Sequence, residues 1–555
     1  MKNIKLYVAC FSFVFAMAGC DDITNLNNNP NEPDDTVNYN LNDPRLASTL
    51  RAGIPMEGDD EQRIKSLMLD YFAQIADGGN FSTKNYVMNE DWNRRMYRRV
   101  QSNVSSLNIV IRNLLPEIED YRHTIAVAKI WRVFTQASGV DYFGPIPFAQ
   151  YTVVEDNPPY MSVEDNYNEF FRELEEAVNM LGQESTNPIF ISSNSDLLYG
   201  NSVAKWRAFA NSLRLRYALR LSEVDVERCK TEAKKAIESG VMADRSGNAY
   251  LPPKANGDWG QDYNYTMFQI TWGGAINMTQ TFEKLVTNIG GADFPKDIFN
   301  KRNAKKTPLS NIHPEKVDLR ATAMFDPAFD TGDWKGVTYG LPTAEYNATV
   351  AKSCAEMGFL YNNGTPYKSR PYDVMLFEEV CFLKAEAIER GFVTGDAKAE
   401  YEKGVQASFA TWGQSAIAAD DYLKSNEKNL AGTSANYDDF EEFGAATGNT
   451  RLEKIITQKY IAAFPDVSFE SWNDKRRLNL PRFDVGAYRY EAQYVATNKD
   501  IKDPSNFIRR VQYPEQENQI NKVEYDKGVK LLGGPDQSNT PIWWDKSKNY
   551  CTSVK

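Results

Sequence analysis

The chain has 555 residues and a formal net charge of -12. Because a general nucleic-acid binder carries a basic footprint, this acidic balance argues against nucleic acid as a partner. The only two histidines, His123 and His313, argue against a His-rich metal site and against a His-centred catalytic triad.

The N-terminus has the pattern of a secretory signal. Lys2 and Lys5 precede an apolar run from Leu6 to Ala18, which is too short to span a bilayer stably. The string AMAGC, which ends at Cys20, resembles the bacterial lipobox and implies cleavage before Cys20 and diacylglycerol on its thiol. The alternative is an ordinary cleaved signal with an incidental cysteine. An acylated Cys20 would anchor the chain durably, because each buried methylene adds about 0.8 kcal/mol.

A polar segment follows this anchor. Asp21 and Asp22 come directly after Cys20, and an acidic cluster there resembles the surface-export signal of Bacteroidetes lipoproteins. Residues 23–44 show no apolar period, which predicts a tether or a loop that wraps the body. No later apolar run reaches membrane-spanning length, so we expect the rest of the chain outside the cytoplasm. We therefore divide the chain into a signal peptide (1–19), a lipidated tether (20–45) and a single domain (46–555).

Helical periodicity dominates the first half of that domain. Asp91 is the expected N-cap of a long helix, whose stripe of apolar residues ends at Leu114. A second helix is predicted over 122–138, and it stops before DYFGPIPF because a glycine and two prolines prevent continuation. Ser162 with Asp165 forms a capping-box pattern at the start of a third helix.

Two helix hairpins are predicted from similar patterns. The first combines a helix over 203–221 with a return helix that ends at Ser239. The second lies in 371–413, where two apolar stripes precede a turn and Asp396 is the expected N-cap of the return helix. Small residues packed against aromatics at a period in the thirties are typical of tetratricopeptide-like units. The sequence thus predicts a degenerate helical array.

The positions of the cysteines and of one aromatic residue predict their surroundings. Cys229 and Cys381 fall on core faces of predicted helices, so we expect buried thiols. Cys354 and Cys551 fall in predicted loops, where spacing does not indicate whether a disulfide forms. After a helix predicted over 452–463, Trp472 is expected to stack on an arginine of the RR pair at 476–477, more often a structural contact than a site.

Residues 248–370 lose most of the helical period, apart from a stretch at about 277–288. The aromatics there are interleaved with Gly, Asn and Asp, as in GDWGQDYNY and DTGDWKGVTYG. Loop regions of this length often carry a functional site, so we expect one here. The alternative is that the aromatic residues fix a large loop to the core.

Several strings occur in a recognisable order: NNNPNEP, DYFGPIPF, WRAFANSLRLRYALRLS, FLKAEAIERG, FESWNDKRR and RRVQYPEQENQINKVEY. With the lipobox at Cys20, this ordered set resembles the SusD/RagB family of nutrient-binding outer-membrane lipoproteins of Bacteroidetes, and it covers nearly the whole mature chain. The resemblance implies a mainly α fold, with a tetratricopeptide-like helical scaffold at about 46–247 and 371–480. A loop-rich, ligand-binding part is expected at about 248–370 and 481–555.

The same resemblance implies a function. Family members capture an oligosaccharide, or in some branches a peptide, above a SusC-like TonB-dependent transporter of the outer membrane, and they have no catalytic centre. The expected location is the cell exterior, with the membrane touched only through the lipid.

A sugar ring offers an apolar C–H face and a polar rim, so its binder needs flat aromatics beside amide and charged side chains. The loops from 77 to 92 and from 259 to 339 contain both kinds. The candidate ligand-binding residues are Asp77, Asn80, Tyr86, Trp92, Trp259, Trp272, Trp334 and Tyr339.

Three alternatives remain open at this point. A surface glycosidase would need two carboxylates about 5 or 9 Å apart across a cleft, and no catalytic string stands out. A peptide importer or a protein-interaction scaffold would use the same helical grooves for peptides. No cofactor is expected; calcium would suit the Asp-rich loops, but no ordered ligand spacing supports it.

Overall fold

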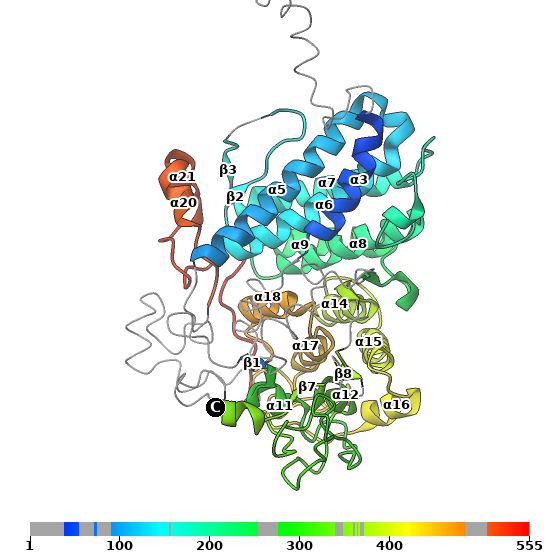
Figure 1. Cartoon of the computed structure of the whole chain (residues 1–555), viewed down its shortest axis with the longest axis vertical. Coiled ribbons are helices and arrows are strands. Elements are labelled where there is room, and N and C mark those ends of the chain that lie inside the picture. Colours follow the sequence, from blue (N-terminus) through cyan, green and yellow to red (C-terminus); the bar gives the residue numbers. More distant parts are fainter. Residues whose placement is uncertain are drawn as a thin grey trace, which may run out of the picture.

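A computed structural model of the chain describes residues 38–54, 72–74, 90–154, 157–252, 276–338, 348–358, 361–362, 365–366, 371–482 and 508–553. Helices predominate in these ranges and the strands are short, which confirms the mainly α fold class. Figure 1 shows an upper group of helices from the first half of the chain above a lower group from the second half.

The upper group is built from helices that follow one another along the chain, each packed against the one before it (Figure 1). The predicted cap at Ser162 is confirmed, because its side chain accepts a hydrogen bond from the Asp165 backbone N–H at 3.0 Å. The hairpin predicted from residue 203 is also confirmed. The helices are α3 (Asn38–Ala52), α5 (Glu90–Leu114), α6 (Ile118–Phe143), α7 (Val163–Leu181), α8 (Val203–Arg220) and α9 (Val226–Ser239), with 3-10 turns at Leu115–Glu117, Ser193–Ser195 and Arg245–Gly247.

Three boundaries of this group differ from the prediction. Helix α5 begins at Glu90, so Asp91 lies inside its first turn and is not its N-cap. The helix predicted to end at 138 continues to Phe143 and stops at Gly144, whose φ of +84° disfavours a side chain. A Cβ there would meet Leu532 at 3.1 Å and Ile542 at 3.2 Å, so the C-terminal segment closes over this turn. Helix α3 begins at Asn38, so the end of the tether predicted over 20–45 is helical.

The lower group contains the second predicted hairpin. Asp396 accepts a hydrogen bond from the Ala399 backbone N–H at 3.0 Å, which confirms the predicted cap. Helix α14 packs against α8, so the two hairpins meet in space and the predicted helical array is confirmed. The helices are α14 (Phe377–Glu389), α15 (Ala397–Thr411), α16 (Ala416–Lys424), α17 (Arg451–Ala462) and α18 (Ser468–Leu478).

The start of the 371–413 stretch forms a strand that the sequence did not reveal. Strand β10 (Tyr372–Met375) pairs antiparallel with β4 (Ala249–Leu251). All four residues of β10 are buried, and a short buried run cannot be told from a helix by periodicity alone. This strand pair lies at the junction of the upper and lower groups.

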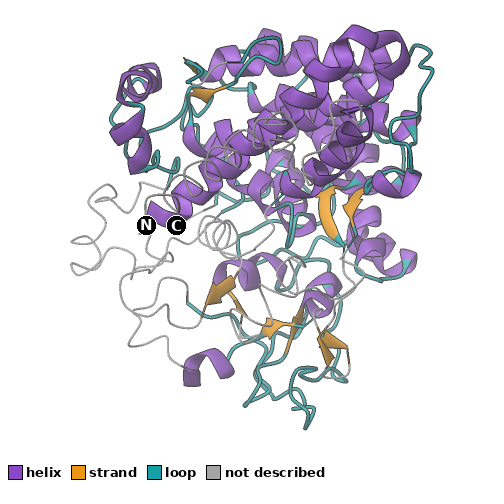
Figure 2. Ribbon diagram, turned by 45° about the horizontal axis from the view of Figure 1, so that its top comes forward, coloured by secondary structure: helices purple, strands orange, loops and turns teal. Residues whose placement is uncertain are grey.

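A small antiparallel sheet forms largely within the region predicted as loop over 248–370. Its strand order is β1-β5-β7-β6, formed by β1 (Phe72–Gln74), β5 (Ile276–Met278), β7 (Glu356–Met357) and β6 (Phe325–Asp326). The first residues of the helix predicted at about 277–288 belong to strand β5, so the helix found there is the shorter α11 (Gln280–Val286). Figure 2 shows that most strands lie apart from the helical bundle. The remaining elements are α12 (Leu319–Met324), α13 (Ala348–Lys352), β2 (Ile146–Pro147), β3 (Tyr160–Met161), β8 (Tyr361–Asn362) and β9 (Thr365–Pro366).

The C-terminal part holds two helices where loops were predicted. Helices α20 (Glu515–Ile520) and α21 (Lys522–Leu532) lie beside the upper group (red in Figure 1). Only Gly528 and Leu532 of α21 are buried, so too few apolar positions mark the helical period in the sequence. None of the helices within the described ranges is both long and apolar enough to cross a bilayer.

The core runs through both groups of helices, since Trp131 and Trp206 above and Trp472 below belong to one buried cluster. The predicted burial of Cys229 and Cys381 is confirmed; Cys354 is buried as well, and these thiols are free, as is that of Cys551.

Helix α18 is unusual because almost all of it is buried, including its charged residues. Arg477 donates to Glu386 of α14 at 2.8 Å and to Asp474 at 2.9 Å, and Lys459 pairs with Asp474 at 2.8 Å. The guanidinium of Arg476 lies 3.4 Å from the Trp472 ring centroid, which confirms the predicted stack and makes it part of the core. Charged side chains thus connect α14, α17 and α18 without contact with solvent.

Candidate binding site

The structure locates two of the eight residues predicted to bind ligand. The other six lie outside the described residues and stay predictions: Asp77, Asn80, Tyr86, Trp259, Trp272 and Tyr339.

Trp334 belongs to the core. Its side chain is 0% exposed, its indole N–H donates to the Phe325 carbonyl at 3.3 Å, and its ring packs edge-on against Phe294 at 5.1 Å between centroids. A ring without an exposed face cannot stack on a sugar, so the prediction of Trp334 as a ligand contact is wrong in this structure. The Gly- and Asp-rich sequence around it suggested exposure, but the residue fixes its loop to the core.

Trp92 is also buried, with 6% of its surface exposed in the first turn of α5. Its spacing to Met96 and Val100 continues the apolar stripe of that helix, because residues four apart share a face. The prediction of Trp92 as a stacking platform is therefore corrected as well. The spacing that shows this was present in the sequence.

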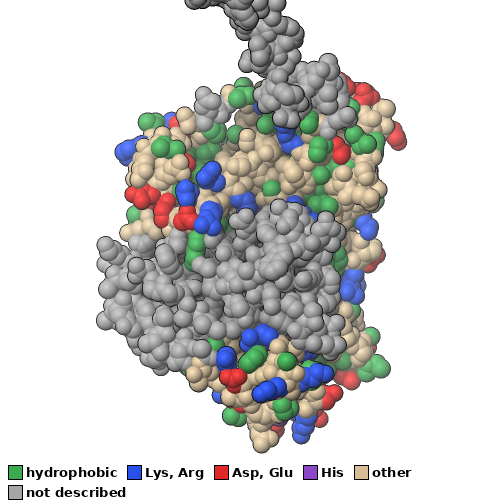
Figure 3. Space-filling view, in the orientation of Figure 1, with side chains coloured by type: hydrophobic (Ala, Val, Ile, Leu, Met, Phe, Trp, Pro, Cys, Tyr) green, Lys and Arg blue, Asp and Glu red, His purple; other side chains and the backbone are tan. Residues whose placement is uncertain are grey.

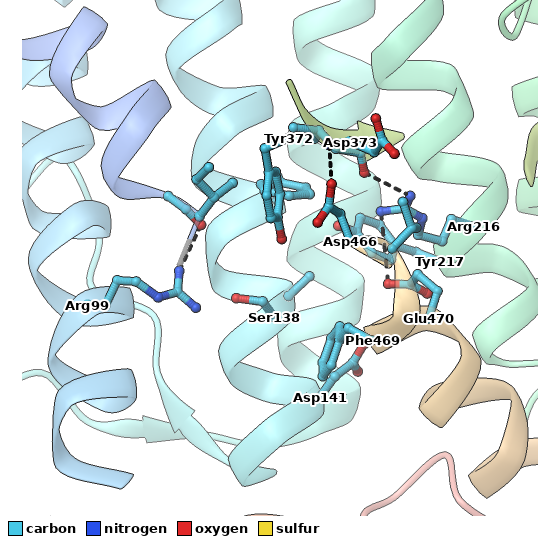
Figure 4. A pocket seen from close by; sticks show the side chains of 16 residues that line it. Arg99, Ser138, Asp141, Arg216, Tyr217, Tyr372, Asp373, Asp466, Phe469 and Glu470 are labelled. Carbon is cyan, nitrogen blue, oxygen red and sulfur yellow. Dashed lines mark hydrogen bonds and ion pairs between the residues drawn. The ribbon is translucent and has the colours of Figure 1, made fainter. Parts of the chain in front are cut away.

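A cavity lies where the upper and lower groups meet (Figure 4). Helices α5, α6 and α8 form one wall, and β10 with the start of α18 forms the other. Figure 4 shows Arg99 on one side and Asp466 on the opposite side, with Ser138 between them. The volume is about 60 Å³, well below the roughly 300–1,000 Å³ of small-molecule sites. Such a space suits water and not an oligosaccharide.

The charged groups around this cavity are held by the protein. Arg216 forms two hydrogen bonds of 2.7 Å with the Glu379 carboxylate. Asp141 accepts hydrogen bonds from the Tyr167 hydroxyl at 2.7 Å and from the Trp544 indole N–H at 3.0 Å. These contacts join α6, α8, α14 and the C-terminal segment.

Burial and pairing act in opposite directions on the carboxylates here. Burial raises the pKa of Asp141, although the Arg220 and Arg476 guanidiniums oppose the shift. Burial also acts to raise the pKa of Glu470, but Arg220 and Arg216 outweigh it and hold that pKa below its usual value. The pattern is that of a buried structural network, and the sequence did not reveal it.

Within the ranges that the structure describes, no group of three or more His, Cys, Asp or Glu side chains is arranged to hold a metal ion.

The packed helix hairpins define a helical scaffold. Residues 44–514 match a SusD-like family that is described as starch-binding and associating with the outer membrane. The chain therefore belongs to this family.

Solved structures agree with this assignment. A SusD homologue from Parabacteroides distasonis is 54% identical, with a TM-score of 0.86 over 93% of this chain and 100% of that chain. A SusD homologue from Bacteroides thetaiotaomicron has 24% identity and a TM-score of 0.68 over 90% of this chain and 99% of that chain. A chitin-binding SusD homologue from Flavobacterium johnsoniae has 23% identity and a TM-score of 0.68 over 90% and 97%. The last two show the shared fold alone. No curated protein matches the chain.

Proposed function

We propose that this chain is a lipid-anchored protein of the cell surface that captures oligosaccharides and delivers them to a SusC-like TonB-dependent transporter in the outer membrane. The observation that carries the proposal is membership of a starch-binding, outer-membrane-associated family over residues 44–514. The lipobox-like string at Cys20 supports the anchor.

The ligand contacts are proposed to come from the loops around Asn80, Trp259, Trp272 and Tyr339. These loops combine aromatic rings, which can stack on the C–H face of a sugar, with amide and carboxylate groups that bind its hydroxyls. A relative with the same fold is described as chitin-binding, which supports a saccharide as the class of ligand.

The role is proposed to be binding without catalysis. Hydrolysis of a glycosidic bond needs one carboxylic acid and one carboxylate facing a cleft. The carboxylates around the cavity at the helix junction, Asp141 and Glu470, are instead buried in hydrogen bonds and ion pairs with their neighbours. This supports a structural role for them.

Affinity electrophoresis against a panel of polysaccharides tests the proposal. We expect at least one glycan to retard the protein without release of product. Trp259→Ala and Trp272→Ala should each weaken binding by about 1–3 kcal/mol if the ring stacks on the ligand. Trp543→Ala is the matched control, because this partly buried tryptophan is far from those residues in the sequence and is not a candidate ligand contact.

Three results would contradict the proposal. Release of shorter sugars would indicate a glycosidase. Binding of peptides without binding of any glycan would favour the peptide-importer or scaffold function. Unchanged affinity in both tryptophan variants would place the site elsewhere.

A further inference from the structure

A basic and aromatic surface lies at the end of the lower group, on the loops around 296–309, 327–334 and 348–352. On the face seen in Figure 3, Lys and Arg side chains gather at the lower end of the molecule with hydrophobic side chains between them. We call this the Phe329 surface. It consists of Phe299, Arg302, Lys305, Lys306, Phe329 and Lys352.

Phe329 has cations close to its ring. The Arg302 guanidinium lies 4.1 Å from the ring centroid and the Lys352 ammonium 5.6 Å from it. Two hydrogen bonds of 2.7 Å hold Arg302 on Glu356, which is 1% exposed. The guanidinium is therefore fixed beside a half-buried ring.

The turn at 303–307 joins Phe329 to the second ring. The Asn303 amide and the Thr307 hydroxyl both donate to the Phe329 carbonyl, at 2.9 and 2.7 Å. On the same turn, the Lys306 ammonium lies 5.2 Å from the centroid of Phe299, which is also half-buried. The two rings and their lysines thus belong to one ordered surface.

Charge on this surface is not balanced locally. Lys305, Lys306 and Lys352 form no ion pair with any residue that the structure describes. Two exposed acidic residues also lie on these loops: Asp297, two residues before Phe299, and Asp330, whose backbone N–H donates to the Lys352 carbonyl at 3.0 Å. The local excess of cations attracts anions at short range, although the net charge of the whole chain is -12.

We propose that the Phe329 surface binds an acidic saccharide. The C–H face of a sugar would lie against the exposed parts of the Phe329 and Phe299 rings, and the lysines would bind its carboxylate or sulfate groups. This rests on the proposed function and goes beyond it, because it adds a second contact, for uronic-acid or sulfated glycans, made by residues other than those proposed above.

The test compares acidic with neutral glycans. Purified protein is run in affinity gels and titrated with polygalacturonate, heparin, starch and chitin oligosaccharides at low and high salt. We expect binding of an acidic glycan that weakens as salt screens the charges. The triple variant Lys305→Glu, Lys306→Glu, Lys352→Glu should weaken that binding at least about tenfold, since three attractive charges are replaced by three that repel the ligand.

A matched control changes the same number of charges elsewhere. Lys424, Lys546 and Lys548 are exposed and lie outside the surface, so their triple replacement by Glu should leave binding unchanged apart from the common loss of net charge. Equal effects of the two triple variants would overturn the proposal.

Other outcomes separate this inference from the proposed function. If neutral glycans bind and acidic ones do not, the inference fails and the proposed function stands. If no glycan binds at all, both fail. If vesicles of anionic lipid bind through these lysines while acidic glycans do not, the surface contacts a membrane and the assignment to a saccharide is wrong.

Discussion

A buried ion pair between Glu386 and Arg477 joins α14 to α18. Removing one partner tests how much this pair contributes to the free energy of unfolding. Both residues are at most 1% exposed. We predict that Glu386→Ala lowers the free energy of unfolding by about 3–5 kcal/mol, because the Arg477 charge stays buried without its main partner.

The magnitude follows from the neighbouring charges. Asp474 still accepts from Arg477 at 2.9 Å, but it also pairs with Lys459 at 2.8 Å. In the variant, two cations would therefore share one carboxylate. Burial acts to raise the pKa of Glu386, yet Arg477 and Arg390 hold it below its usual value, so the native site stabilises the negative charge that the substitution removes.

Urea unfolding followed by circular dichroism measures the effect. The double variant Glu386→Leu, Arg477→Met should lose less stability than the single Glu386→Ala variant, because no unpaired charge remains buried. Glu238→Ala, which removes an exposed partner of Lys234 on α9, is the control and should be close to neutral. A loss below about 1 kcal/mol for Glu386→Ala, or a double variant as unstable as the sum of both single ones, would refute the reasoning.

Three further predictions concern the core. Cys381→Asp should unfold the protein, because it puts a carboxylate at a position with 0% exposure; a native circular dichroism spectrum would contradict the two-sided burial of α14. Trp334→Ala should lower the free energy of unfolding in urea by about 3–5 kcal/mol, while the glycan affinity of the folded protein stays unchanged. A loss of affinity would indicate that Trp334 contacts the ligand. Burial lowers the pKa of Lys454 to about 7, so the unfolded chain binds more protons above that pH and stability should rise from about pH 7 towards pH 10. Lys454→Met should remove this rise in urea midpoints, and an equal rise in the variant would show that another group titrates.

Local rules predicted the parts of the fold that depend on near neighbours. The caps at Ser162 and Asp396 and the amphipathic helices follow from spacing within one turn or one face. Helix α18 could not be predicted in the same way, because the string ESWNDKRR resembles a solvated helix. Its burial depends on partners such as Glu386, 91 positions away.

The candidate site shows a similar limit. Composition identified loops with many aromatics, but composition does not distinguish an exposed ring from one that fixes a loop, and Trp334 is of the second kind. For Trp92 the four-residue spacing to Met96 and Val100 was the better guide. The cations around Phe329 went unnoticed because Arg302 and Lys352 are far apart in sequence and meet only through the fold.

The closure of the α6 C-terminus by the end of the chain has a consequence for biogenesis. Val511 donates its backbone N–H to the Tyr142 carbonyl at 2.7 Å, and Trp544 reaches Asp141 across 403 positions of sequence. An emerging polypeptide therefore lacks the groups that complete its first helices until Val511 and Trp544 have been synthesised. Contacts of such long range form late and slow folding. Truncations that remove residues 508–553 should therefore fail through misfolding of the first half of the chain.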